Sequence, residues 1–276
     1  MAIKKVRPRR AWTPPKPKPP PYRGPKLLPA PPRGKRGRAT AAAAPSFSNP
    51  LTGWTTDPVH GVWASDPLWT PPADGGAVSS WRNGGSVGGD LVQATGAAQP
   101  TYRSSTVGFN NKPTVEFDGT DDGLYVNPAD VAQPWWFVVV GSIDAASGSR
   151  AFVGNGAGGA FRLGTDSVVG AQWRFVPGSG ISGGTTDTSP HLFVATANNL
   201  SGALVVDGVS VVTGAVGTNA MTAWSVGAGN NGAGALGAFL DGHVAYAAVF
   251  DADPTAQAEW ASFKAWVLTT YGIAVA

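Results

Sequence analysis

The chain has 276 residues and a formal net charge of +3, yet its charges are divided very unevenly along the sequence. It contains no cysteine, which excludes disulfide bonds and thiolate metal sites. Its longest strongly apolar run, WWFVVVG at residues 135–141, is too short to span a bilayer as a helix, so the sequence predicts no membrane-spanning helix.

Residues 1–44 form a basic, proline-rich segment that holds 13 Lys or Arg, 11 Pro and no acidic residue. Prolines remove backbone donors and favour extended conformations, and few apolar side chains are present to offset the entropy of ordering. We therefore expect an extended arm that is disordered when alone. Because prolines and lysines stand where the apolar part of a signal peptide would lie, we also expect synthesis in the cytoplasm without a signal peptide.

Three interpretations of this arm remain open. The favoured one is anchoring, in which the arm orders against acidic surfaces of other proteins in a larger assembly. The second is binding to nucleic-acid phosphates, which is less favoured because prolines and apolar residues interrupt the charge. The third is a solvated tail. The residues assigned to anchoring are Lys4, Lys5, Arg7, Arg9, Arg10, Trp12, Tyr22, Arg33, Lys35, Arg36 and Arg38.

We expect residues 45–59 to link the arm to a folded body at residues 60–276. The 232 residues after the arm hold 7 basic and 17 acidic side chains, so their net charge is −10 while that of the arm is +13. Short apolar segments separated by Gly, Asn, Asp and Thr indicate antiparallel β structure. The expected strands lie at residues 114–117, 123–126, 135–143, 160–164, 171–176, 191–196 and 239–250.

The clearest hairpin is ALVVDGVSVVTG at residues 203–214. Between its alternating valines, Asp207 and Gly208 supply the two residues with positive φ that a type I′ turn requires. This pattern predicts two antiparallel strands joined by a tight turn.

A single helix is expected at residues 254–271. Asp253 is suited to the N-cap, Pro254 to the first helical position and Gly272 to the position after the last turn. Large apolar side chains follow at spacings of three or four residues and predict a buried stripe: Trp260, Phe263, Val267 and Tyr271.

Three segments together resemble a known family. They are AVSSWRNGG at residues 77–85, VEFDGTDDGLYV at 115–126 and FLDGHVAYAAVFDADPTAQAEWASFKAWVLTTYGI at 239–273. In this order they are similar to the concanavalin A-like, laminin-G-like sandwich domains. The resemblance implies an all-β, antiparallel jelly-roll sandwich with one C-terminal helix, whose usual work is glycan or protein binding, sometimes with calcium.

Such domains, in chains rich in small residues and without signal peptides, look like minor tail proteins of bacteriophages. With the arm, this resemblance predicts a non-enzymatic virion protein in the tail or tail tip, present in many copies. Its lectin-like domain would bind a host-surface glycan or protein, and its arm would contact other virion structural proteins. Two alternatives are a capsid or capsid-decoration protein, whose arm binds nucleic acid or the shell, and a glycoside hydrolase.

Catalytic motifs are few. The sequence has only two glutamates, and Glu116 with Asp118 lacks the ExDxE run of enzymes that share this fold, so no catalytic residue is expected. GISGG at residues 180–184 matches a nucleophile-elbow pattern, but no helix follows it, so we interpret it as a flexible loop.

Ligand and metal sites are suggested only by residue type. Aromatic faces with nearby amides suit a glycan, and the residues least committed to other roles are Trp81, Trp173, Trp224, Asn230 and Asn231. No metal site is expected from the three histidines, which lie more than 50 residues apart. No cofactor is expected apart from calcium, for which the candidate ligands are Asp118, Asp121 and Asp122.

Overall fold

A computed structural model of the protein describes Phe47 and residues 49–127, 131–146, 148–155, 161–165, 170–230 and 236–276. The expected anchoring arm, residues 1–44, lies outside the described residues, as do Asn231 and the side chain of Asn230. In the described part of the chain, no helix is both long and apolar enough to cross a membrane.

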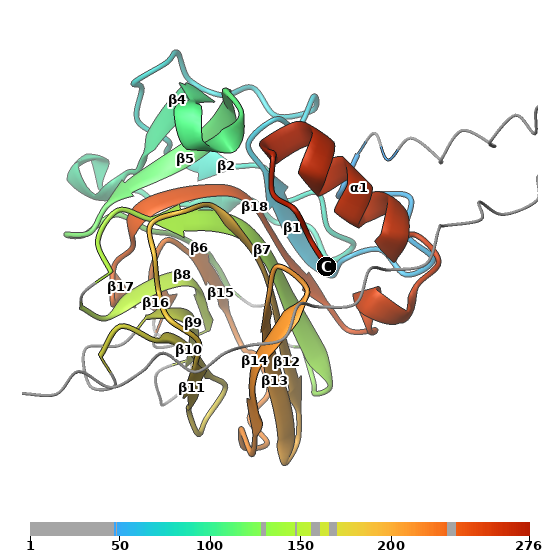
Figure 1. The fold of residues 1–276 in the computed structure, drawn as a ribbon. Coiled ribbons are helices and arrows are strands. Elements are labelled where there is room, and N and C mark those ends of the chain that lie inside the picture. The colour runs from blue at the N-terminus through green and yellow to red at the C-terminus, as the bar shows by residue number, and fades with distance from the viewer. Residues whose placement is uncertain are drawn as a thin grey trace, which may run out of the picture. The chain divides into compact units, whose positions relative to one another are not determined.

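Eight strands form the first antiparallel sheet, sheet A (Figure 1). Seven follow the order β14-β13-β12-β7-β18-β5-β4, and β1 pairs with β18 beside this path. The strands are β1 (His60–Trp63), β4 (Thr101–Thr106), β5 (Lys112–Asp118), β7 (Trp135–Ile143), β12 (His191–Asn198), β13 (Ser201–Val206), β14 (Val209–Gly214) and β18 (Asp241–Phe250).

Sheet B has eight strands in the order β11-β10-β9-β8-β15-β6-β3-β2. Its members are β2 (Ser80–Trp81), β3 (Leu91–Val92), β6 (Leu124–Val126), β8 (Arg150–Asn155), β9 (Phe161–Thr165), β10 (Trp173–Val176), β11 (Ile181–Gly183) and β15 (Trp224–Val226). A short ribbon pairs β16 (Gly229–Asn230) with β17 (Leu236–Gly237). The chain also forms the single-turn 3-10 helices η1 (Gly96–Ala98), η2 (Val107–Phe109) and η3 (Pro254–Ala256).

The central strand β7 shows why the body has two apolar layers. All nine of its residues are buried. Since neighbouring side chains of a strand point to opposite faces, Phe137 and Val139 enter the core between the sheets, whereas Val138 and Val140 enter a second core on the other face of sheet A. This explains why WWFVVVG is a continuous apolar run instead of an alternating one.

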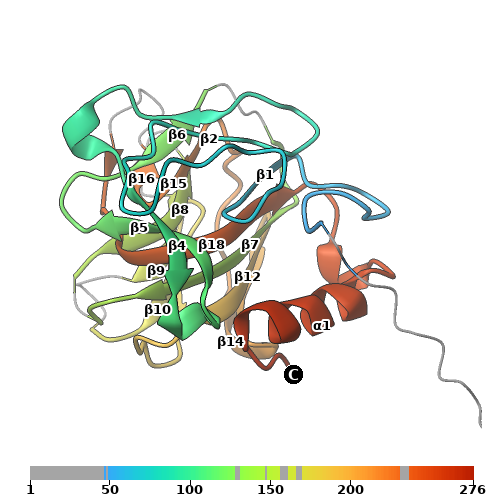
Figure 2. The ribbon, with the colours of Figure 1, turned by 90° about the horizontal axis from the view of Figure 1, so that it is seen from above.

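The second core is closed by α1 (Trp260–Tyr271), which lies on the outer face of sheet A beside β18 (Figures 1 and 2). Gly272 ends the helix with a left-handed φ of 77°, as predicted. Asp253 accepts a hydrogen bond from the Thr255 N–H, but it caps only η3, and the α-helix begins at Trp260. The expected helix 254–271 is therefore two pieces.

Residues of the expected linker, 45–59, also belong to the second core. Leu51 and Trp54 are buried, and the Trp54 ring lies 5.2 Å from that of Phe263 on α1. Phe47 makes a T-shaped contact with Phe263 at 5.7 Å. Over its described residues, this segment is thus part of the folded body.

The predicted hairpin is confirmed. β13 and β14 pair around Asp207 and Gly208, whose φ values of 51° and 83° are those that a type I′ turn requires. The interpretation of GISGG at residues 180–184 as a flexible loop was wrong. Ile181–Gly183 pairs with β10 as the edge strand β11 of sheet B. Two antiparallel sheets with one C-terminal α-helix make the body an all-β, concanavalin A-like sandwich of the jelly-roll type.

Candidate functional site

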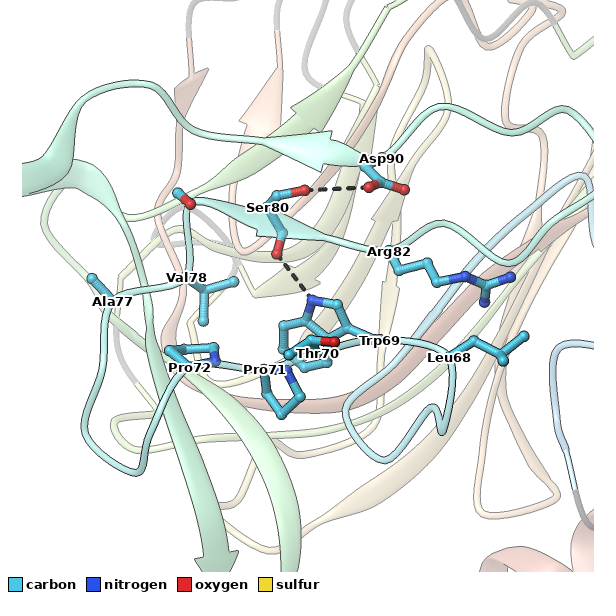
Figure 3. Close-up of a pocket in the computed structure, with 11 residues that line it drawn as sticks. Leu68, Trp69, Thr70, Pro71, Pro72, Ala77, Val78, Ser80, Arg82 and Asp90 are labelled. Carbon is cyan, nitrogen blue, oxygen red and sulfur yellow. Dashed lines mark hydrogen bonds between the residues drawn. The ribbon is translucent and has the colours of Figure 1, made fainter.

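A surface pocket of about 490 Å³ lies beside β2, between the loop at residues 68–72 and the start of β3 (Figure 3). One side is apolar and carries Leu68, Pro71 and Pro72. The other side is polar and carries Ser80, Arg82 and Asp90. It therefore offers both an apolar surface and hydrogen-bonding groups to one small ligand.

The loop that forms the apolar side is fixed by a buried carboxylate. Asp66, whose side chain has no exposed surface, accepts a hydrogen bond from the backbone N–H of Leu68 and forms an ion pair with Arg82. The backbone N–H of Trp69 donates to the carbonyl of Asp66 at 3.1 Å. These contacts tie the loop to the end of β2.

Trp69 gives the pocket a rigid aromatic wall. Its indole N–H donates to the carbonyl of Ser80 at 3.1 Å. Its ring stacks on Trp81 with centroids 5.7 Å apart and meets Tyr102 edge to face at the same distance. Although Trp69 is largely buried, it lines the pocket.

Asp90 supplies the exposed acceptor at the mouth. One of its oxygens accepts from the backbone N–H of Asn83 at 3.1 Å, and the other accepts from the Ser80 hydroxyl at 3.4 Å. Each carboxylate oxygen can accept a further hydrogen bond, so Asp90 can bind ligand hydroxyls while it keeps these contacts. Figure 3 shows Asp90 and Ser80 on the side of the pocket opposite Pro71 and Pro72.

The tryptophans proposed from the sequence lie elsewhere. Trp81 and Trp224 have no exposed surface and Trp173 is 2% exposed, so all three fill the core between the sheets. Their rings are not accessible to a glycan in this structure, and only Trp81 touches a pocket residue, through Trp69. Asn230 and Asn231 lie where the structure describes no side chain.

Sequence reasoning missed the residues that line the pocket. The usable signal was LWTPP at residues 68–72, where two prolines after a tryptophan keep that part of the chain out of a strand ladder. Nothing in the sequence indicates that this loop meets residues 80–90.

A second group of polar side chains forms where β5 and β18 pair. Glu116 and His243 are cross-strand partners, and Asp144 follows β7. One oxygen of each carboxylate and one ring nitrogen of His243 lie within 4.8 Å of one another. Thr114 Oγ1 lies 3.2 Å from His243 Nδ1, and Glu116 also forms an ion pair with Arg103.

Within this group, the surroundings of Asp144 shift its pKa upward. Burial raises the pKa of Asp144; His243 opposes this rise, while the nearby Asp241 and Glu116 carboxylates add to it. A carboxyl with a raised pKa beside a second carboxylate has the components of an acid–base pair, and two carboxylates with an imidazole also have donor types that divalent metals accept.

The calcium candidates do come together in the structure. Oxygens of Asp118, Asp121 and Asp122 lie within 4.8 Å of one another, and burial raises the pKa of Asp122 to about 6. However, Asp118 Oδ1 accepts from the backbone N–H of Thr120, and Asp122 Oδ2 accepts from that of Asp118. These two carboxylates therefore already stabilise the turn after β5.

Comparison with known proteins gives a fold and no family. No family model matches the chain, and no curated protein matches its sequence. A Trypanosoma rangeli sialidase, solved with sialic acid, is 15% identical, with a TM-score of 0.50 over 79% of this chain and 33% of the sialidase. The chain thus spans about a third of the length of that protein.

Two carbohydrate-related domains are more distant. Domain 4 of AbnA, a GH43 extracellular arabinanase from Geobacillus stearothermophilus solved with arabinotriose, is 10% identical, with a TM-score of 0.42 over 56% of this chain and 78% of that domain. The CBM40 of a Ruminococcus gnavus IT-sialidase is 11% identical, with a TM-score of 0.33 over 47% of this chain and 90% of that one.

The sialidase comparison corrects one expectation from the sequence, namely that the protein is not an enzyme. The sialidase whose solved structure has a similar fold is an enzyme. The lack of an ExDxE run was therefore insufficient evidence against catalysis. Glu116 also comes close to Asp144, a partner that lies far away in the sequence.

Proposed function

We propose that the sandwich binds a carbohydrate in the pocket beside Trp69. The observation that carries the proposal is the arrangement of an apolar wall opposite Ser80 and Asp90, at the end of a rigid aromatic stack. A sugar ring has apolar C–H faces and a rim of hydroxyls, so it matches both sides of such a pocket. The fold shared with a sialidase solved with sialic acid is compatible with this function.

Binding of the full-length protein to an immobilised panel of oligosaccharides tests the proposal. We expect Asp90→Ala to weaken binding at least about tenfold, because a hydrogen bond to a charged group is lost. Asp251→Ala, at an exposed carboxylate after β18, is the matched control and should bind as the wild type does. Equal binding by the Asp90 variant would place the glycan elsewhere.

We further propose that the protein is a bacteriophage virion component of the tail or tail tip, related to laminin-G-like minor tail proteins and held in the particle by residues 1–44. The charge division of +13 and −10 supports two regions that face different partners. The alternative is a capsid or decoration protein whose arm binds nucleic acid or the shell. Immunogold labelling of particles distinguishes tail from head, and absence of the protein from both would reject the proposal.

Glycoside hydrolysis is a second candidate function, favoured by the closeness of Glu116 and Asp144. Retaining glycosidases hold two carboxyl groups about 5–5.5 Å apart, one as acid and one as nucleophile. Here an oxygen of each lies within 4.8 Å of the other, and the raised pKa of Asp144 suits the acid. If the protein is a glycoside hydrolase, the wild type releases reducing sugar and Glu116→Gln does not. The control variant Asp251→Asn should release it as the wild type does. No release by the wild type rejects it.

A further inference from the structure

The two charged residues that line the Trp69 pocket, Arg82 and Asp90, differ in whether another charge of the protein balances them. Arg82 is the cation of the pocket wall, but it is engaged by the fully buried carboxylate of Asp66. Removing one partner of a buried ion pair leaves an uncompensated charge, which is strongly unfavourable. Asp66 therefore balances the charge of Arg82, and the pair adds no net charge to the pocket.

Asp90 is in the opposite situation. Its carboxylate is exposed at the mouth and accepts only neutral donors, the Ser80 hydroxyl and the Asn83 N–H, in the hydrogen bonds that fix it. Among the residues that the structure describes, no Lys or Arg forms an ion pair with Asp90. With Arg82 and Asp66 neutralising each other, the pocket carries a net charge of −1 that belongs to Asp90.

We infer that this pocket selects uncharged sugars and rejects acidic ones, with Asp90 as the residue that determines this specificity. The inference rests on the proposed carbohydrate binding. Sugar hydroxyls donate to the free lone pairs of Asp90, and the C–H face of the ring packs on the side of Pro71 and Pro72. A sugar carboxylate in the same place would meet Asp90 as a like charge and would be repelled.

The selectivity is therefore opposite to what a shared fold with a sialidase would suggest. The sialidase was solved with sialic acid, which is an acidic sugar. This chain presents at its pocket a carboxylate and an arginine that is already paired. An anionic sugar is favoured by a site of net positive charge, whereas the net charge of this pocket is negative.

The test uses full-length protein and matched ligands, namely a panel of neutral oligosaccharides and the same oligosaccharides oxidised at the terminal C6 to uronic acids. We expect each neutral ligand that binds to bind at least about tenfold more tightly than its oxidised form at low salt. The ratio should fall as the salt concentration rises, because Asp90 is exposed and its charge is screened.

Two variants connect the selectivity to one carboxylate. Asp90→Asn keeps the size and an acceptor oxygen, so it should still bind the neutral ligands while the ratio falls to within about threefold. Asp251→Asn removes an exposed carboxylate outside the pocket and should keep the wild-type ratio.

The possible outcomes separate the two proposals. Oxidised ligands that bind the wild type as tightly as neutral ones, or a ratio that Asp90→Asn leaves unchanged, would overturn the selectivity inference alone. Failure of the wild type to bind any member of the panel would overturn the proposed carbohydrate binding, and the selectivity with it.

Discussion

At the residue scale, two histidines of sheet A, His60 and His191, have pKa values that are shifted in opposite directions. His60 on β1 is fully buried, lies tilted against the Trp224 ring with centroids 5.4 Å apart, and has Nδ1 3.0 Å from the Asn83 amide nitrogen. Because that amide nitrogen is a donor, Nδ1 accepts and Nε2 carries the proton of the neutral ring. Burial lowers the pKa of His60 from 6.5 to about 4.

The lowered pKa makes stability depend on pH in one direction. The unfolded chain takes up a proton at His60 below about pH 6.5 and the folded one does not, so stability is lost as the pH falls from 6.5 toward 4. We expect the wild type to lose about 2 kcal/mol more than His60→Phe between pH 7 and pH 5, measured by urea unfolding. Equal losses in the two proteins would contradict this prediction.

His191 on β12 has the reverse behaviour. Burial lowers its pKa, but hydrogen bonds to Asp207 at 2.6 Å and Asp187 at 3.0 Å outweigh burial, so the pKa is raised above 6.5. The charged ring therefore stabilises the fold below about pH 6.5, and this contribution disappears as the pH rises through the folded-state pKa.

The His191 pKa can be measured directly. An NMR titration of the ring protons should give a midpoint above 6.5 in the wild type and a lower one in Asp207→Asn, since the nearer carboxylate is then uncharged. Asparagine also tolerates the positive φ of 51° at this turn, so the hairpin should persist. Asp251→Asn should leave the midpoint unchanged. An unchanged midpoint in Asp207→Asn would show that another group raises the pKa.

At the element scale, α1 covers apolar side chains that a simple two-layer sandwich would leave in water. Phe263 packs against Trp54, Tyr246 and Trp266, with centroids 5.2–5.6 Å apart. The rings come from the segment before β1, from β18 and from α1 itself. The helix therefore forms the layer that covers the outer face of sheet A.

Truncating this contact should be costly. We expect Phe263→Ala to lower the free energy of unfolding by about 3–5 kcal/mol, because it removes a large buried ring and leaves a cavity. Leu268→Ala is the control on the same helix, since Leu268 is 49% exposed, and should change stability by less than about 1 kcal/mol. Urea denaturation followed by tryptophan fluorescence measures both. A loss for Phe263→Ala no larger than that for Leu268→Ala would mean that α1 is not part of the core.

At the scale of the whole molecule, the folded body begins before residue 60. Leu51 and Trp54 are buried against sheet A and α1, and the Trp54 indole N–H donates to the Pro50 carbonyl at 3.0 Å.

Two truncations locate the boundary. Removing residues 1–44 should leave a folded β protein whose Tm is within about 2 °C of the full-length value, whereas removing residues 1–59 should lower the Tm by about 5–10 °C through the loss of Trp54 and Leu51. Differential scanning calorimetry measures both. Unfolding on removal of 1–44 would mean that the arm is needed for the fold, and equal Tm values for both truncations would place the boundary at residue 60.

The sequence by itself determined those features that depend on neighbours in the chain. Asp207-Gly208 specified a turn, Gly272 ended the helix, and alternating valines gave the strands of the hairpin. Each is a local conformational preference of a few residues, so no distant contact was needed to predict it. The split between a basic arm and an acidic body is likewise a property of composition.

Tertiary structure alone decided which side chains meet. The two-residue strands β2 and β3 have no periodicity to detect, yet they place Ser80 and Asp90 opposite the loop with Trp69. Strand pairing brings Glu116 to His243 across 127 positions of sequence. The sequence does not distinguish Trp81, Trp173 and Trp224 from exposed tryptophans. Only the packing between the sheets shows that they are buried. The pocket and the position of its charged residues therefore depend on long-range strand register and packing. No local conformational preference encodes these.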